Sequence, residues 1–165
     1  MKKSSENFNG NHGLTLVEVL ITTSIILTFL VALFWTHNLY LETAFSNRNV
    51  IKAAQLAEEG LEVIRFLRDS SWNTNIMPLS LDTNYYLVLE NGEWQIGTGQ
   101  VFIDTTFERT ITLSAVYRDI SADIVSEGGT LDPDTLMVVS SASWLNRGAT
   151  TTKSVSTYIT NIFNN

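Results

Sequence analysis

The sequence of 165 residues contains no cysteine and only two histidines. Without cysteine, the chain can form neither a disulfide bond nor a thiolate metal site. The histidines are His12 and His37, so the chain beyond residue 37 has no imidazole. This excludes a histidine-based triad or zinc site there, and the sequence shows no glycine-rich phosphate loop and no paired acid and base. We therefore predict no enzymatic activity and no cofactor.

Proline and glycine are scarce in the first half of the sequence. No proline precedes Pro78, and Gly60 is the only glycine between residues 14 and 91. These two residue types are the usual helix breakers. The sequence therefore predicts one helix over residues 14–69, on the order of 80 Å long, with a natural stop at Ser70-Ser71.

Charge is almost absent from the start of this helix. From residue 14 to residue 35 the only ionisable side chain is Glu18. At about 1.5 Å per residue this stretch reaches roughly 33 Å, enough to cross a hydrocarbon core of about 30 Å. Its Ser and Thr hydroxyls can donate hydrogen bonds to carbonyls one turn earlier. No small-residue cleavage site follows, which argues against a secretory signal peptide. We predict one transmembrane helix.

Basic residues flank this apolar segment unequally. Lys2 and Lys3 precede it, whereas the first basic residue after it is Arg48. The positive-inside rule then places the short N-terminus in the cytoplasm and residues 36–165 outside. We expect a single-pass protein of the cytoplasmic membrane.

The junction between the polar leader and the apolar segment carries a specific pattern. Gly13 is followed by Leu14-Thr15-Leu16-Val17-Glu18, which opens the apolar run. The pattern resembles the class III signal of type IV prepilins and type II secretion pseudopilins. Taken singly, a glycine before a helix is an ordinary loop residue, and the helix dipole favours a glutamate in the first turn by about 0.3–1 kcal/mol. The spacing at the mouth of a membrane span favours the prepilin interpretation.

This resemblance implies how the chain is processed and assembled. In that family a prepilin peptidase cuts after the glycine, here between Gly13 and Leu14, and commonly methylates the new N-terminal amine, here that of Leu14. The glutamate, here Glu18, is thought to pair with the N-terminal amine of a neighbouring subunit. The implied partners are other pilin or pseudopilin subunits, the peptidase and an inner-membrane platform protein. The assembled subunit would belong to a periplasmic or cell-surface filament.

Beyond the apolar segment the helix becomes amphipathic. Apolar residues recur at 4-3-4-3 spacing on one face, and charged residues occupy the other. On the charged side Arg65 is placed to pair with Glu62 and with Asp69. The apolar face, which needs a body to pack on, comprises Val50, Ala54, Ala57, Leu61, Ile64 and Leu67.

Strand patterns follow the helix. Asn91-Gly92 within residues 85–97 predicts a hairpin, and residues 107–119, 136–145 and 152–163 alternate apolar and polar side chains. Trp72 and Trp94 fit a core, an interface or a surface equally well. The expected core comprises Tyr86, Leu87, Leu89, Ile111, Leu113, Val116, Val138, Trp144 and Ile159.

Several strands after one helix, with no helices between them, indicate an antiparallel α+β fold. The predicted organisation is a leader over residues 1–13, a transmembrane and filament-core helix over 14–36, its amphipathic continuation over 37–69, and an antiparallel β head over 70–165. The second half of the helix packs on this head, an arrangement that the resemblance also implies.

Charges in the head suggest little chemistry. We expect Glu108-Arg109 and Arg118-Asp119 to be surface charges. Asp132-Pro133-Asp134, with Glu127 and Asp123 nearby, fits either a type I turn or part of a calcium site.

The net charge of −7 bears on possible partners of the head. An acidic surface argues against sequence-independent binding of nucleic acid. The filament-subunit interpretation competes with a membrane-tethered binding subunit, such as an adhesin or a DNA-uptake pilin tip. That alternative shares the anchor and differs in what the head contacts.

Overall fold

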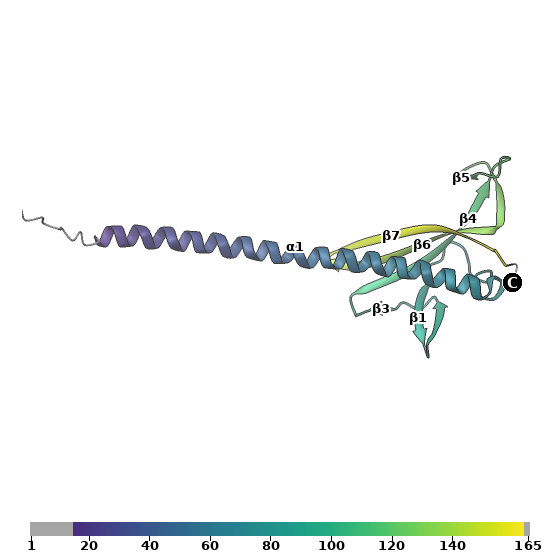
Figure 1. Cartoon of the computed structure of the whole chain (residues 1–165), viewed down its shortest axis with the longest axis horizontal. Coiled ribbons are helices and arrows are strands. Elements are labelled where there is room, and N and C mark those ends of the chain that lie inside the picture. Colours follow the sequence, from purple (N-terminus) through teal and green to yellow (C-terminus); the bar gives the residue numbers. More distant parts are fainter. Residues whose placement is uncertain (1–14, 164–165) are drawn as a thin grey trace, which may run out of the picture. The chain divides into compact units, whose positions relative to one another are not determined.

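The computed structural model describes residues 15–163. Its residue contacts divide the chain into two units, one ending at Ala44 and one beginning at Phe45. The helix α1 (Leu16–Ser70) contributes its first part to one unit and its second part to the other. The fold is α+β, as predicted, and the second part of α1 packs on an antiparallel sheet (Figure 1).

The first part of α1, up to Ala44, has no buried side chain. Within residues 15–163, α1 is the one helix long and apolar enough to cross a membrane. Large apolar side chains in this part are highly exposed, and those of Phe34 and Trp35 reach 68% and 79%. Its surface is therefore suited to contact lipid or another apolar surface.

In its second part, from Ala53 to Leu67, one side of α1 is buried. The buried face is wider than the predicted stripe, and Val50 and Ala54 of that stripe are only half-buried. The face is wide because the main sheet, through Ile111 and Val138, and a separate hairpin, through Leu87, pack on the same helix. Its buried residues are Ala53, Leu56, Ala57, Gly60, Leu61, Val63, Ile64 and Leu67.

The C-terminal end of α1 lies close to the predicted stop. Ser71 caps a short second helix, α2 (Trp72–Asn75), which was not predicted; the Ser71 side chain accepts a hydrogen bond from the Thr74 amide. Of the two predicted ion pairs, Arg65 with Glu62 is confirmed. The pair with Asp69 is wrong, because the carboxylate of Asp69 contacts its neighbour Arg68 at 2.7 Å.

The main sheet is antiparallel, with strand order β3-β4-β6-β7, and β5 pairs with β4. Figure 1 shows β6 and β7 running alongside the second part of α1. Side chains alternate between the two faces of a strand. Val138 and Ile159 face α1, so Met137 and Tyr158 lie on the opposite face. The strands are β3 (Phe102–Ile103), β4 (Phe107–Arg118), β5 (Ile124–Val125), β6 (Thr130–Asn146) and β7 (Ala149–Thr160).

A separate hairpin joins β1 (Tyr86–Glu90) and β2 (Glu93–Gly97). The predicted turn at Asn91-Gly92 is confirmed, with φ of 53° and 84° at its two residues. Positive φ at both central positions is what a type I′ turn requires. Arg147-Gly148, with φ of 52° and 83°, makes a turn of the same kind between β6 and β7.

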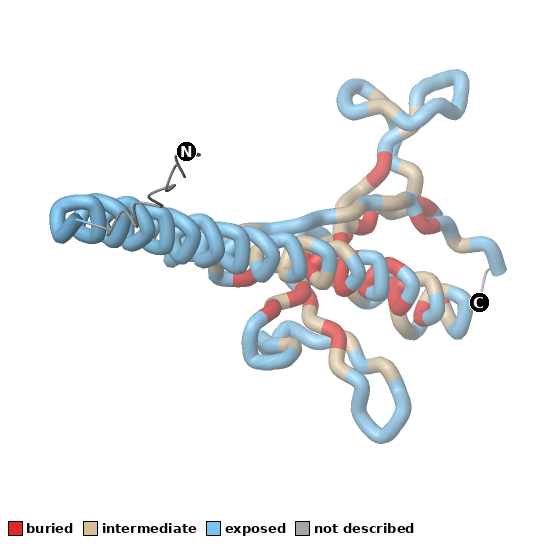
Figure 2. The backbone as a smooth tube through the Cα atoms, turned by 60° about the vertical axis from the view of Figure 1, so that its left-hand side comes forward, coloured by how far each residue is buried: buried red, intermediate tan, exposed pale blue. Residues whose placement is uncertain are grey.

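The predicted core is confirmed except at the hairpin (Figure 2). Leu89 is 56% exposed, and Tyr86 is half-buried whereas its neighbour Tyr85 is buried. Tyr85 forms an antiparallel bridge with Ile111 of β4, which turns Tyr85 and Leu87 toward the core and leaves the far end of β1 in solvent. The Trp72 side chain is part of the core, at 4% exposure.

The strand β6 begins earlier than predicted and contains Pro133. Ala115 of β4 pairs with Leu136, but the next residue, Val116, pairs with Asp132. Residues 133–135 therefore form a bulge without partners on β4. A proline has no amide hydrogen to donate, and a bulge is one of the few places in a sheet that accept it. The type I turn expected at Asp132-Pro133-Asp134 is thus a bulge within a strand.

Candidate functional site

The N-terminal end of α1 holds the described part of the predicted processing motif. Gly13 and Leu14 lie outside the described residues. Glu18 lies in the first turn of α1, where its amide donates a hydrogen bond to the Thr15 hydroxyl at 3.3 Å. A Thr followed three residues later by a Glu is the pattern of a capping box, and the carboxylate also suits the positive end of the helix dipole. The Thr15 hydroxyl therefore caps the first turn of α1, and the Thr15–Glu18 spacing makes the Glu18 carboxylate a candidate for the second half of a capping box.

The hydroxyls in the apolar part of α1 are satisfied by the helix itself. Thr22 donates to the Glu18 carbonyl at 2.7 Å, and Ser24 and Thr28 each donate to a carbonyl one turn earlier. This confirms the expected back-bonding, which hides polar groups from an apolar surrounding. The surface that remains is formed by exposed Leu, Ile, Val and Phe side chains.

At the junction of helix, sheet and hairpin lies Arg109, which was predicted to be a surface charge. That prediction is wrong, because the residue is 3% exposed. Its Nη1 lies 3.2 Å from Glu59 Oε1 on α1, and its guanidinium lies 5.5 Å from the centre of the Trp94 ring on β2. Arg109 thereby joins three elements. The alternation of β4 indicates this burial, because Arg109 shares a face of the strand with Phe107 and Ile111.

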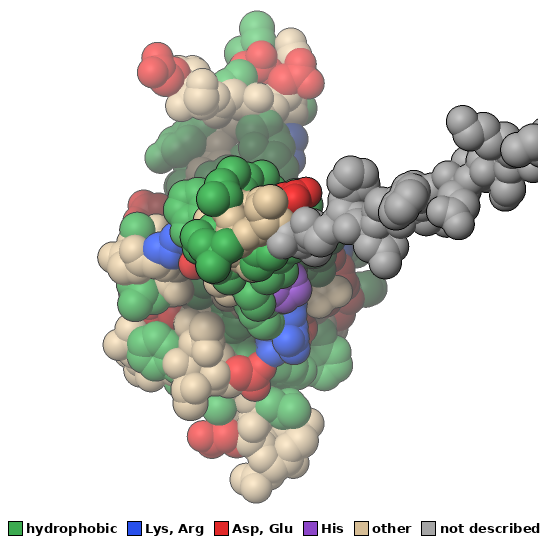
Figure 3. Space-filling view, turned by 90° about the vertical axis from the view of Figure 1, so that its left-hand side faces the viewer, with side chains coloured by type: hydrophobic (Ala, Val, Ile, Leu, Met, Phe, Trp, Pro, Cys, Tyr) green, Lys and Arg blue, Asp and Glu red, His purple; other side chains and the backbone are tan. Residues whose placement is uncertain are grey.

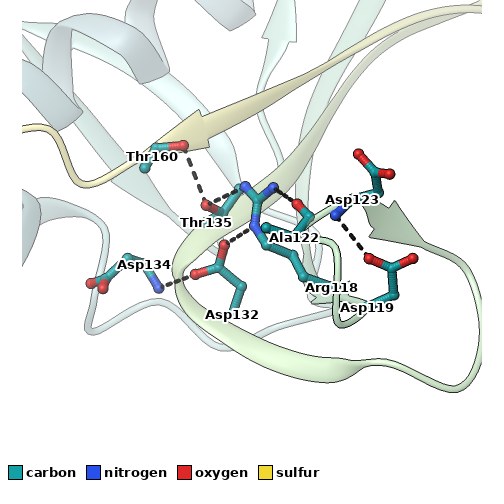
Figure 4. A network of polar contacts seen from close by, with 8 residues as sticks. All are labelled: Arg118, Asp119, Ala122, Asp123, Asp132, Asp134, Thr135 and Thr160. Carbon is teal, nitrogen blue, oxygen red and sulfur yellow. Dashed lines mark hydrogen bonds and ion pairs between the residues drawn. The ribbon is translucent and has the colours of Figure 1, made fainter.

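A second polar junction surrounds Arg118 at the end of β4 (Figure 4). Its Nε donates to Asp132 Oδ2 at 2.6 Å, its Nη1 donates to the Ala122 carbonyl at 2.8 Å, and its Nη2 lies 3.4 Å from the Thr135 hydroxyl. Thr135 in turn contacts the hydroxyl of Thr160 on β7. Arg118 was also expected to be a simple surface charge, yet it holds the β4–β5 loop and the β6 bulge together.

The carboxylates near this junction already have protein partners. Asp132 accepts from Arg118, and the Asp119 carboxylate accepts from the amides of Ser121 and Asp123. The pKa of Asp132 is lowered from its ordinary value of 3.8, chiefly by the hydrogen bond from Arg118 and then by that of Thr135. Over residues 15–163, no group of three His, Asp or Glu residues is placed to hold a metal ion. The structure thus adds no support to the calcium alternative.

Comparisons of the chain with protein-family models, with curated proteins and with solved structures find no match. The long apolar N-terminal helix packed on an antiparallel sheet is consistent with a pilin-like architecture. The link to that family therefore rests on this architecture and on the pattern from Gly13 to Glu18.

Proposed function

We propose that the chain is a minor pilin or pseudopilin, a structural subunit of a type IV pilus or a type II secretion-like filament. One observation carries this proposal: a helix of 55 residues that is apolar and uncovered in its first part and packed on an antiparallel sheet in its second. A plain membrane anchor needs only about 20 residues. The uncovered surface suits both storage in a bilayer and later packing against the helices of other subunits.

In this proposal the leader is cut between Gly13 and Leu14, and the α-amine of Leu14 becomes a cation close to Glu18. An unpaired carboxylate is costly within hydrocarbon. Pairing Glu18 with the N-terminal amine of a neighbouring subunit removes that cost in the filament and fixes the axial position of the subunit. Because the net stability of a buried ion pair is variable, we assign the pair to register rather than to stability.

The first test is processing by a prepilin peptidase. The chain is expressed in host cells with and without the peptidase, and the intact mass of the protein extracted from their membranes is measured. We expect the loss of residues 1–13 when the peptidase is present, and retention of the full mass in Gly13→Ala. Gly10→Ala, which changes a glycine of the same leader, is the matched control and should be cut normally. The proposal would be contradicted if Gly13→Ala were cleaved at the normal rate. It would also be contradicted if the peptidase did not cleave the unaltered chain.

A further inference from the structure

A hollow lies at the end of the main sheet where β5 pairs with β4. It has a volume of about 510 Å³, and its lining surface is polar and apolar in nearly equal parts. Tyr117, Ile124, Met137 and Tyr158 are among the residues that line it. Tyr117 and Tyr158 are 42% and 50% exposed. Since Met137 and Tyr158 are on the face that points away from α1, the hollow is separate from the contacts that hold the helix.

The loop beside the hollow presents an isoleucine to solvent. Ile120 is fully exposed, yet the backbone around it is fixed by hydrogen bonds. The Asp119 carboxylate accepts from the amides of Ser121 and Asp123 at 2.8 and 3.0 Å, and the Ala122 carbonyl accepts from Arg118 at 2.8 Å. Ala122 has a φ of 65°, a conformation that costs an alanine about 1–2 kcal/mol. The loop is therefore held in a strained form around a side chain that adds nothing to the core.

The chain that returns from β5 is packed tightly against β4. A Cβ atom at Gly129 would lie 2.7 Å from Val125 Cγ2 and 2.8 Å from the Arg118 carbonyl oxygen. Only glycine permits this approach. Together with the Arg118 hydrogen bonds, it fixes the position of the loop relative to the hollow, and fixing a binding surface in advance lowers the entropy cost of association.

The charge around the hollow and the loop is almost wholly negative. The only basic side chain in residues 115–137 is Arg118, which is already bonded to Asp132 and Ala122. At the top of Figure 3, the end at which Figure 1 shows β5, Asp and Glu side chains lie on both sides of hydrophobic ones. Such a rim repels phosphates and anionic lipids, and it also repels a second copy of a chain of net charge −7. The acidic residues of this region are Asp119, Asp123, Glu127, Asp132 and Asp134.

We propose that this end of the head is a docking surface for a basic polypeptide segment that carries large apolar side chains. An apolar side chain of the partner enters the hollow between Tyr117 and Tyr158, and Ile120 extends the apolar contact. Lys and Arg residues of the partner lie against the acidic rim, which favours encounter and excludes acidic segments. This surface goes beyond the filament proposal and does not depend on it.

The test uses the full chain in nanodiscs of zwitterionic lipid and three fluorescent synthetic peptides. The first, GKRLFRKG, is basic with an apolar centre. The second, GEELFEEG, has glutamates in place of the basic residues, and the third, GKRSSRKG, has two serines in place of the leucine and phenylalanine. Binding is measured by fluorescence anisotropy, with protein-free nanodiscs as the reference for lipid binding. We expect the first peptide to bind at least about tenfold more tightly than either of the others, and added salt to weaken it. Equal binding of the acidic peptide would overturn the proposal.

Two variants locate the surface. Ile120→Ser changes a side chain that contributes nothing to the core, and Asp123→Lys with Glu127→Lys reverses the rim. Each should weaken binding of the first peptide at least about fivefold. The matched controls are Leu145→Ser, at an exposed leucine near the β6–β7 turn, and Glu90→Lys with Glu93→Lys in the separate hairpin. Both should bind as the unaltered chain does.

Two results would contradict this assignment. One is an equal loss of binding in the controls, which would place the contact elsewhere or make it unspecific. The other is self-association of the chain without peptide that Ile120→Ser abolishes. That outcome would make a second copy, rather than a basic segment, the occupant of the surface.

Discussion

Gly60 lies where α1 closely approaches the main sheet. A Cβ atom there would lie 2.3 Å from the Ser140 hydroxyl oxygen, 3.0 Å from Ile111 Cδ1 and 3.2 Å from Arg109 Cδ. Ser140 is fully buried, and its hydroxyl has no hydrogen-bond partner within residues 15–163. A glycine inside a helix usually costs stability relative to alanine, so its presence here is explained by the close approach.

We predict that Gly60→Ala destabilises the protein. Overpacking costs about 1–3 kcal/mol and exceeds the gain in helix propensity of about 1 kcal/mol. Ser140→Ala removes the nearest atom and should recover part of that loss in the double variant, while costing little alone because its hydroxyl is unpaired. The free energy of unfolding is measured by urea denaturation with tryptophan fluorescence.

Gly99→Ala is the control for this cycle. No atom lies within 4 Å of a Cβ added at Gly99, so its free energy of unfolding should stay close to that of the unaltered chain. If Gly60→Ala proves as stable as Gly99→Ala, the close approach of α1 to the sheet at Gly60 is contradicted. The same holds if adding Ser140→Ala restores none of the stability that Gly60→Ala loses.

At the scale of elements, the pairing of Arg118 with Asp132 links β4, β6 and the loop before β5. The pKa of the Asp132 carboxyl is lowered in the folded chain, so the stabilisation is fully present above about pH 4, the unfolded value. It is lost as the pH falls through the lower, folded value. We predict that Asp132→Asn lowers the free energy of unfolding near neutral pH by about 1 kcal/mol, because both partners are partly exposed.

The same substitution should flatten the loss of stability below pH 4, since the charge responsible for it is gone. Urea denaturation from pH 2 to pH 7 measures both effects. Asp134→Asn, a change to an exposed acid of the same bulge, is the comparison and should leave the curve unchanged. A steep acid limb that persists in Asp132→Asn would assign the effect to another carboxylate.

How far the elements could be predicted depended on the range of the contacts that define them. The helix α1 and the Asn91-Gly92 hairpin were predictable because periodicity and turn chemistry act over a few residues. The extent of β6 was not, because the bulge at residues 133–135 exists only through pairing with β4. Burial of Arg109 could have been predicted from the alternation of β4, but the partners that make it tolerable, Glu59 and Trp94, are remote in sequence.

At the scale of the whole molecule, the two halves of the chain carry different information. In our proposal, the pattern from Gly13 to Glu18 directs the processing and assembly of the chain, because it resembles the signal of a family of filament subunits. The surface around Ile120 and the hollow has no such sequence signature, because Tyr117, Met137 and Tyr158 meet only in the folded sheet. The sequence therefore predicted the apolar N-terminal helix and the processing motif at its start. The proposed docking surface could be found only from the structure.

Two roles for Glu18, in capping α1 and in pairing with a neighbouring N-terminus, make different predictions at this scale. In a capping box, glutamine three residues after the cap residue can take the place of glutamate, but it carries no charge. Glu18→Gln should therefore leave helix content and leader removal unchanged. If the charge pairs with the Leu14 amine, the same variant should enter filaments at least about tenfold less, because leaving one buried charge without its partner costs about 3–5 kcal/mol.

The measurement compares the amount of the subunit in sheared filaments with the amount in membranes, in a host that has the assembly machine. Val19→Leu, an apolar change at the next residue of the same turn, is the matched control and should assemble normally. Gly13→Ala, which keeps the leader and so never exposes the Leu14 amine, should fail in assembly to the same degree as Glu18→Gln. Normal incorporation of Glu18→Gln would leave Glu18 with only its capping role, because the amine would then need no carboxylate partner.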